Sequence, residues 1–189
     1  MATLVIGGGI SIGSGVSVAM KPYTASSALA LAHDTTPYVT AWAWSSSTGF
    51  GSKYTNPATL PTGNAQAAAF NPAGDTLLIG HQTSPYMTAY PWNNSTGFGT
   101  KYTNPSPLTG ISVYGAAWSP SGAAIVCSLA STPFIAAYAW SAGFSTKYSN
   151  PVTIPTGAGN AVAFSPDGKS VVIGHATCLL YTSDAADDT

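Results

Sequence analysis

One stretch of this sequence, residues 68–86, is repeated: Ala68-Ala69-Phe70-Asn71-Pro72-Ala73-Gly74-Asp75-Thr76-Leu77-Leu78-Ile79-Gly80-His81-Gln82-Thr83-Ser84-Pro85-Tyr86. It returns as Ala116-Ala117-Trp118-Ser119-Pro120-Ser121-Gly122 and as Val162-Ala163-Phe164-Ser165-Pro166-Asp167-Gly168-Lys169-Ser170-Val171-Val172-Ile173-Gly174-His175. A fainter copy is Val18-Ala19-Met20-Lys21-Pro22. Self-similarity at a fixed spacing indicates a stack of equivalent structural units.

Tryptophans and lysines fix the period of the repeat. A step of 48 residues separates three tryptophans: Trp44, Trp92 and Trp140. Steps of 48 and then 46 residues separate three lysines: Lys53, Lys101 and Lys147. The two missing residues fall in the loop before Phe144. A deletion confined to a loop, in an otherwise constant register, is typical of stacked units.

Each unit contains four short runs rich in β-branched and aromatic residues, separated by turn signals. The runs are 161–164, 170–174, 38–44 and 51–55, numbered in whichever unit shows each one most clearly. The second run is apolar throughout, which predicts a strand buried on both faces. Because no helical periodicity is present, we expect all-β units of four antiparallel strands. The predicted units are 13–62, 63–109 and 110–156, followed by a partial unit at 157–177 and preceded by a lead-in at 1–12.

Three features of the repeat resemble the WD40-like β-propeller family. The turn Phe164-Ser165-Pro166-Asp167-Gly168 is similar to the first hairpin of that family, and Gly80-His81 is similar to its Gly-His pair. The three tryptophans stand where that family ends its third strand in Trp-Asp, although here Ser or Asn follows the Trp. The resemblance covers residues 13–177. It implies a β-propeller arc of about three complete blades plus partial ones.

Composition excludes some classes of function. The net charge is −1 and only 6% of residues are charged. Nucleic-acid binding requires clustered Lys and Arg, so the sequence predicts no nucleic-acid partner. No stretch reaches the roughly 18 apolar residues that span a bilayer, so we expect no membrane insertion and no signal peptide. The low charge with abundant Ser, Thr and Asn favours a virion or cell exterior over the cytosol.

The last residues break the repeat. Residues 178–189 begin Cys178-Leu179-Leu180-Tyr181-Thr182-Ser183, where the pattern calls for Ser-Pro-Tyr. This segment resembles the translation of a transposase-type sequencing adapter, which implies a non-native tail on a fragment from metagenomic assembly. A natural acidic tail is the alternative. With Cys178 set aside, Cys127 stands alone in an apolar run and is predicted to be a small core residue.

Histidines occupy one position of the repeat: His33, His81 and His175, with Leu129 in the third unit. Imidazole is a common zinc ligand, but tetrahedral zinc needs ligands that converge. These residues lie one unit or more apart in sequence. The sequence therefore favours a structural role, in which each ring bonds a carbonyl or hydroxyl in its own unit, over a metal site.

Carboxylates outside the tail give no catalytic pattern. Asp75 and Asp167 fall in hairpin turns, and Asp34 follows a histidine along a strand. Paired-carboxylate catalysis needs two carboxyl groups roughly 5 to 10 Å apart. No nucleophile elbow or phosphate loop is present. We therefore predict no catalytic residue, no metal and no cofactor.

Aromatic residues recur along the third strand of each unit and form a candidate binding face: Tyr38, Trp42, Trp44, Tyr86, Tyr90, Trp92, Tyr138 and Trp140. Their alternation predicts that they share one face of the strand. Such a face could stack on sugars or peptides. Recurrence in every unit favours packing between neighbouring sheets instead.

Two functions remain on sequence grounds. The first is a non-catalytic propeller that serves as a binding or scaffold module for a protein or glycan partner. The second is a propeller hydrolase or lactonase-like enzyme whose catalytic residues lie in further blades. Because an open arc leaves apolar faces and strand edges bare, we also expect this chain to associate with itself.

Overall fold

The computed structural model describes residues 4–6, 10–12 and 27–176, and every regular element in these ranges is a β-strand. The predicted first strand at 13–20 and the segment 178–189 lie outside the described residues. The strands are β1 (Leu4–Ile6), β2 (Ile10–Ile12), β3 (Ser27–Ala32), β4 (Val39–Ser45), β5 (Gly49–Lys53), β6 (Ala65–Phe70), β7 (Thr76–His81), β8 (Met87–Asn93), β9 (Gly97–Phe98), β10 (Val113–Trp118), β11 (Ala124–Leu129), β12 (Ile135–Trp140), β13 (Phe144–Lys147), β14 (Gly159–Phe164) and β15 (Val171–His175).

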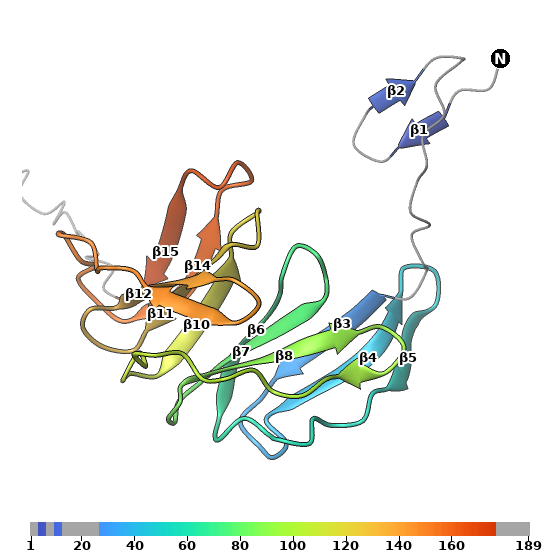
Figure 1. Ribbon diagram of the computed structural model, residues 1–189, viewed down its shortest axis with the longest axis horizontal. Helices are drawn as coiled ribbons and strands as arrows, with labels where there is room; N and C mark the ends of the chain where they lie inside the picture. Colours follow the sequence, from blue (N-terminus) through green and yellow to red (C-terminus); the bar gives the residue numbers. More distant parts are fainter. Residues whose placement is uncertain (1–3, 7–9, 13–26, 177–189) are drawn as a thin grey trace, which may run out of the picture.

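The strands form separate antiparallel sheets in chain order. Two sheets have four strands, β6-β7-β8-β9 and β10-β11-β12-β13, while β3-β4-β5 has three and β14-β15 has two. β1 pairs with β2. The inner strands contact one another from sheet to sheet, β6 with β10 and β10 with β14. The sheets therefore lie side by side in an arc that follows the sequence (Figure 1).

The first hairpin of the second, third and fourth units is fixed by the repeated Asn/Ser-Pro-x-Gly turn. The side chain of Asn71 accepts hydrogen bonds from the backbone N–H groups of Asp75 and Thr76, at 3.0 and 3.1 Å. In the last unit Ser165 Oγ accepts one from Ser170 N at 2.9 Å. Gly74 adopts a φ of 69°, a conformation that glycine reaches at no steric cost. Turn chemistry written into the sequence thus sets the register of the first two strands.

The third strand begins one residue later than its sequence pattern predicts. β4 and β8 start at Val39 and Met87, so Tyr38 and Tyr86 precede the strands. Each follows a cis Ser/Thr-Pro bond and has a φ of 68°. The backbone N–H of Tyr86 donates to the Thr83 carbonyl at 2.7 Å and closes a turn. The prediction that these two tyrosines share a strand face with the tryptophans is therefore wrong.

The core lies between neighbouring sheets rather than within one. One cluster of buried residues joins β4 to β6, β7 and β8, and the other joins β7 and β8 to β10, β11 and β12. Every residue of β7 is buried, as the apolar second run predicts. The equivalent strand β15 is largely exposed, because no third strand covers it in the described part of the chain. Burial therefore depends on which neighbour is present, not on the repeat alone.

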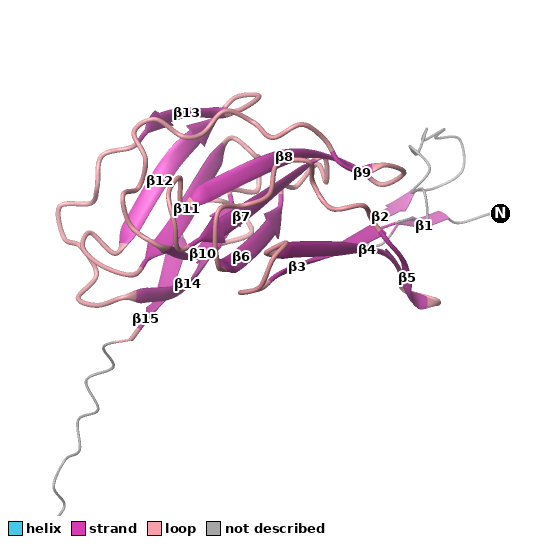
Figure 2. Cartoon of the chain, turned by 90° about the horizontal axis from the view of Figure 1, so that it is seen from below, coloured by secondary structure: helices cyan, strands magenta, loops and turns pink. Residues whose placement is uncertain are grey.

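Secondary structure is all strand and loop throughout the described residues (Figure 2). Within these ranges, no helix has the length and apolar character needed to span a membrane.

Candidate functional site

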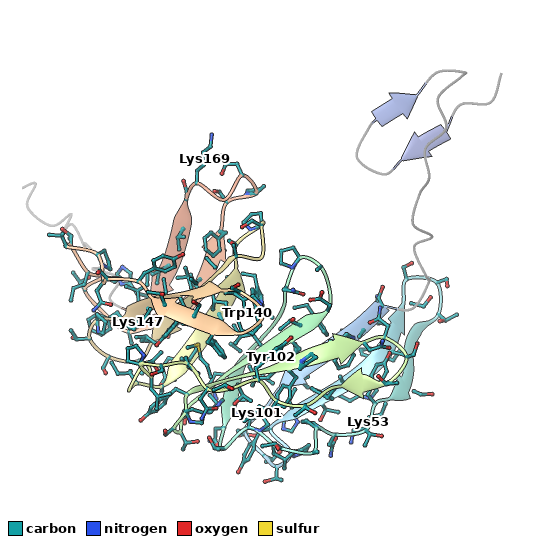
Figure 3. The ribbon with its side chains drawn as sticks, viewed as in Figure 1. Lys53, Lys101, Tyr102, Trp140, Lys147 and Lys169 are labelled. Atoms are coloured by element: carbon teal, nitrogen blue, oxygen red, sulfur yellow. The ribbon has the colours of Figure 1, made fainter. Side chains whose placement is uncertain are left out.

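One cluster of aromatic rings surrounds Trp140, which lies on β12. Its ring meets three others edge to face, with centroid distances of 5.1 Å to Tyr102, 4.9 Å to Trp118 and 5.1 Å to Phe144. Tyr102 comes from the preceding unit, whereas Trp118 and Phe144 belong to the same sheet as Trp140. Figure 3 shows Tyr102 and Trp140 between the two neighbouring sheets. The cluster therefore links one unit to the next.

The same arrangement recurs one unit earlier around Trp92. Its ring lies 4.9 Å from Tyr54, 5.3 Å from Phe70 and 5.1 Å from Phe98, again edge to face. Tyr54 belongs to the preceding unit, as Tyr102 does in the later cluster. Edge-to-face ring pairs contribute about 0.5–1.5 kcal/mol each beyond the area that they bury.

Two buried tyrosines add a hydrogen bond to each junction. Tyr90 Oη donates to the Thr59 carbonyl at 2.7 Å, and Tyr138 Oη donates to the Pro107 carbonyl at 2.9 Å. Both acceptors lie in the connection that leads into the same unit. Burial raises the pKa of both hydroxyls well above the usual range. In the two complete sheets, a Tyr hydroxyl and a Trp ring two residues later thus attach the third strand to the preceding unit.

These contacts leave little ring surface for a sugar or peptide to stack on. Tyr90, Trp92 and Tyr138 are buried. In the first unit Trp42 and Trp44 are half-buried, with Phe50 at 6.2 and 5.2 Å. Phe50 itself is 66% exposed, so the most accessible aromatic ring of this group was not among the residues predicted from sequence.

In the first two units, the histidine of the repeat forms a hydrogen bond with a threonine seven residues later. His81 Nε2 and Thr88 Oγ1 lie 2.9 Å apart, and so do His33 Nε2 and Thr40 Oγ1. Thr35 Oγ1 also lies 3.4 Å from His33 Nδ1. His175 is exposed on β15. Across the described ranges, no three His, Cys, Asp or Glu side chains come together as a metal site would require.

Sequence analysis missed the threonines, although the repeat contains a signal for them. In the third unit Leu129 replaces the histidine, and Ala136 stands where Thr40 and Thr88 stand in the first two units. Both Leu129 and Ala136 are buried. A polar pair and an apolar pair therefore occupy the same place in successive sheets. The joint replacement indicates that the two positions touch.

His81 lies in an apolar setting that disfavours its charged form. Its side chain has no exposed surface, and burial lowers its pKa from 6.5 to about 4. The backbone of Thr83 favours the charged form and opposes this shift, while the charge of Lys101 adds slightly to it. Nδ1 has no partner in hydrogen-bonding geometry among the described residues. The ring is therefore a neutral core residue.

The carboxylates of Asp75 and Asp167 accept hydrogen bonds from residues of their own hairpins. Asp75 Oδ1 accepts from Asn71 Nδ2 at 2.7 Å and from Thr76 Oγ1 at 3.2 Å. Asp167 Oδ1 accepts from Ser165 Oγ at 2.6 Å and from Lys169 N at 3.1 Å, and these bonds lower the pKa of Asp167. These hydrogen bonds stabilise the turns.

Lys53 and Lys147 end outer strands and Lys101 follows one, and two of the three bond within their own loops. Lys147 Nζ donates to Asn150 Oδ1 at 3.1 Å, and Lys101 Nζ donates to Asn104 Oδ1 and to the Tyr102 carbonyl. Figure 3 shows Lys53, Lys101 and Lys147 following one edge of the arc. Burial lowers the pKa of Lys101. These contacts stiffen the connection from which each unit's tyrosine projects.

Apolar surface is exposed on the last units. Val171 is 40% exposed, Val172 is 68% exposed and Tyr148 is 47% exposed. Val152, in the connection to β14, is exposed as well. The residues equivalent to Val171 in the two complete sheets, Leu77 and Ile125, have no exposed surface. We call Tyr148 and Val171 the open face, because Val172 follows Val171 in the strand and lies on the opposite side of β15.

Comparisons with solved structures reveal the fold. A chain in the crystal structure of a mitotic checkpoint complex matches 72% of this chain with a TM-score of 0.50 and 20% sequence identity. Hydrazine synthase from Kuenenia stuttgartiensis matches 71% with a TM-score of 0.51 and 14% identity. The chain is an arc of a β-propeller. It spans 40% and 35% of the length of those two chains. No known family and no curated protein sequence matches it.

Proposed function

We propose that this propeller arc is a non-catalytic binding or structural module that recognises a protein partner. The open face carries the proposal. Its valine, Val171, is 40% exposed among the described residues, whereas the equivalent Leu77 and Ile125 have no exposed surface. Exposed apolar surface of this kind marks interaction sites on soluble proteins.

A protein partner fits the open face better than a glycan partner does. The β15 residue of the open face is the aliphatic Val171, and the tryptophan rings of the complete units are packed against other rings. Aliphatic surface suits the apolar side chains of a peptide. One solved neighbour comes from a multi-protein complex, which agrees with a binding role.

Selection from a random peptide library displayed on phage tests the proposal. We expect the chain to enrich peptides with apolar or aromatic residues at alternate positions. The variant Val171→Asp should lose them, because a charge would replace apolar contact surface. Leu31→Asp is the matched control, since Leu31 is 50% exposed on β3 at the other end of the arc. Enrichment of peptides that bind Val171→Asp equally well would contradict the proposal.

The enzymatic alternative needs its own assay. We expect the chain to hydrolyse ester and lactone substrates no faster than buffer, with or without added calcium or zinc. Turnover above background that is lost in Asp75→Asn or Asp167→Asn would make the chain a hydrolase. One solved neighbour is an enzyme, so the fold itself leaves this outcome open.

A further inference from the structure

The turn between β8 and β9 carries two overlapping copies of a modification motif. Asn93-Asn94-Ser95 and Asn94-Ser95-Thr96 both read Asn-x-Ser/Thr, in which x is not proline. This pattern is the acceptor for N-linked sugars. Every other asparagine of the sequence lacks it, because proline follows the asparagine or because no hydroxyl stands two residues later. The motif therefore occurs at one place in the sequence.

The turn presents the groups that the motif needs. Residues 93–96 are all exposed. Asn93 Oδ1 accepts a hydrogen bond from the backbone N–H of Ser95 at 2.8 Å, and the Asn93 carbonyl accepts one from Thr96 N at 3.2 Å. The carboxamide is thus held by its oxygen, while its nitrogen, Nδ2, makes no hydrogen bond to any described residue. An unbonded amide nitrogen and an exposed hydroxyl two residues later therefore share one turn.

The turn itself does not require asparagine at position 93. In the first unit Ser45 is the equivalent residue, and its Oγ accepts a hydrogen bond from the backbone N–H of Ser47 at 3.2 Å. Serine can make this kind of turn bond with its hydroxyl oxygen. The carboxamide of Asn93 therefore adds a nitrogen that the fold does not use.

Asn94, by contrast, has a structural role. Its Oδ1 accepts a hydrogen bond from Trp92 Nε1 at 2.8 Å, and its backbone carbonyl accepts one from Tyr54 Oη at 2.6 Å. Trp92 is buried, and Tyr54 comes from the preceding unit. Because these bonds fix Asn94 against the junction between two units, Asn93 is the better acceptor in the folded chain.

We propose that Asn93 is an acceptor for an N-linked sugar, with Ser95 as the hydroxyl that a glycosyltransferase recognises. The donor is a glycosyl group activated at its anomeric carbon by a phosphate leaving group, carried on a nucleotide or on a lipid. Asn93 Nδ2 bonds to the anomeric carbon, the bond from that carbon to the phosphate oxygen breaks, and the phosphate leaves with the electron pair. The amide proton passes to a base of the transferase. The glycan would lie on the second unit, whereas the open face belongs to the third and fourth.

Two purified transferases acting on the folded full chain test the site. One is a soluble N-glycosyltransferase with UDP-glucose, and the other is an oligosaccharyltransferase with a lipid-linked oligosaccharide. We expect intact-mass spectrometry to show a single added glycan in at least one arm, and the arm that succeeds identifies the carrier of the sugar. A peptide of residues 90–99 serves as the unfolded reference.

Three variants separate the overlapping motifs. Asn93→Ser introduces the residue that the first unit uses, and Ser95→Ala removes the hydroxyl but keeps the backbone N–H that bonds Asn93. Both should lose the glycan. Thr96→Ala disrupts the Asn94 motif alone, so it is the matched control and should keep the glycan. Circular dichroism of all three should match that of the parent.

Three outcomes would overturn the inference. The first is no glycan on the folded chain in either arm, which would show that the turn is inaccessible if the peptide is modified. The second is a glycan that survives Asn93→Ser and Ser95→Ala but is lost in Thr96→Ala, which would place it on Asn94. The third is loss of the glycan in all three variants, which would show no dependence on the Asn93 motif in particular.

Discussion

His81→Leu should abolish most of the acid sensitivity of the fold. The folded-state pKa of His81 is about 4, below the unfolded value of 6.5, so the unfolded chain binds the proton more tightly. Stability contributed by the neutral ring is complete above the unfolded pKa and is lost as the pH falls from 6.5 towards 4. The free energy of unfolding of the parent should therefore fall by about 2 kcal/mol between pH 7 and pH 5 from this residue alone, and by about 3 kcal/mol in total.

The substitution also has a direct cost that a second change should remove. Thr88 is buried, and His81 is its hydrogen-bond partner. Leaving that hydroxyl unpaired should cost about 1–3 kcal/mol in His81→Leu. The double variant His81→Leu with Thr88→Ala reproduces the pair that the third unit uses, Leu129 with Ala136. We expect it to recover most of the lost stability and to stay insensitive to pH.

Urea denaturation at several pH values, followed by tryptophan fluorescence, measures both effects. His33→Leu is the matched control because it removes the histidine at the same repeat position, where the ring is half-buried. It should retain the pH dependence that His81 produces. A His81→Leu variant with the pH profile of the parent would refute the burial argument. A double variant less stable than His81→Leu would refute the pairing argument.

Three other predictions follow from close contacts and burial. Gly80→Ala should cost about 1–3 kcal/mol because its Cβ would lie 2.5 Å from a buried valine, whereas Gly174→Ala should be neutral in the same denaturation assay. Cys127, whose thiol pKa burial raises to about 12, should resist thiol reagents in a Cys178→Ser background until the chain is unfolded. Tyr138→Phe should lower the free energy of unfolding by about 1 kcal/mol, because its carbonyl partner loses a hydrogen bond.

The repeated pattern was sufficient to predict the fold, because its strongest signals are local. The Pro-x-Gly turns fix the first hairpin in the last three units, and the apolar run that follows gives the second strand. The all-β arc of four-stranded sheets is confirmed by the structure and by its neighbours. Local signals determine the backbone path of one unit. Repetition of that unit at constant spacing then produces the arc.

Positions set by contacts between strands were harder to predict. Tyr38 and Tyr86 continue the aromatic alternation into a turn, and nothing in the alternation marks where the strand begins. The His–Thr pair depends on the register of two adjacent strands, which a deletion or bulge would shift. The open face depends on the neighbour of the last sheet, so equivalent residues such as Leu77 and Val171 differ in burial although the repeat treats them alike.

The close spacing of two neighbouring sheets depends on a glycine in the second strand. A Cβ on Gly80 would lie 2.5 Å from Val113 Cγ1, across the junction between two sheets, and 3.3 Å from Ala67 Cβ. Glycine at this position therefore lets the next sheet approach. Gly174 is its equivalent in β15, yet the nearest atom to its Cβ position is Ala161 Cβ of its own sheet, at 3.9 Å. The last sheet thus keeps the residue that permits close approach at a place where no described neighbour uses it.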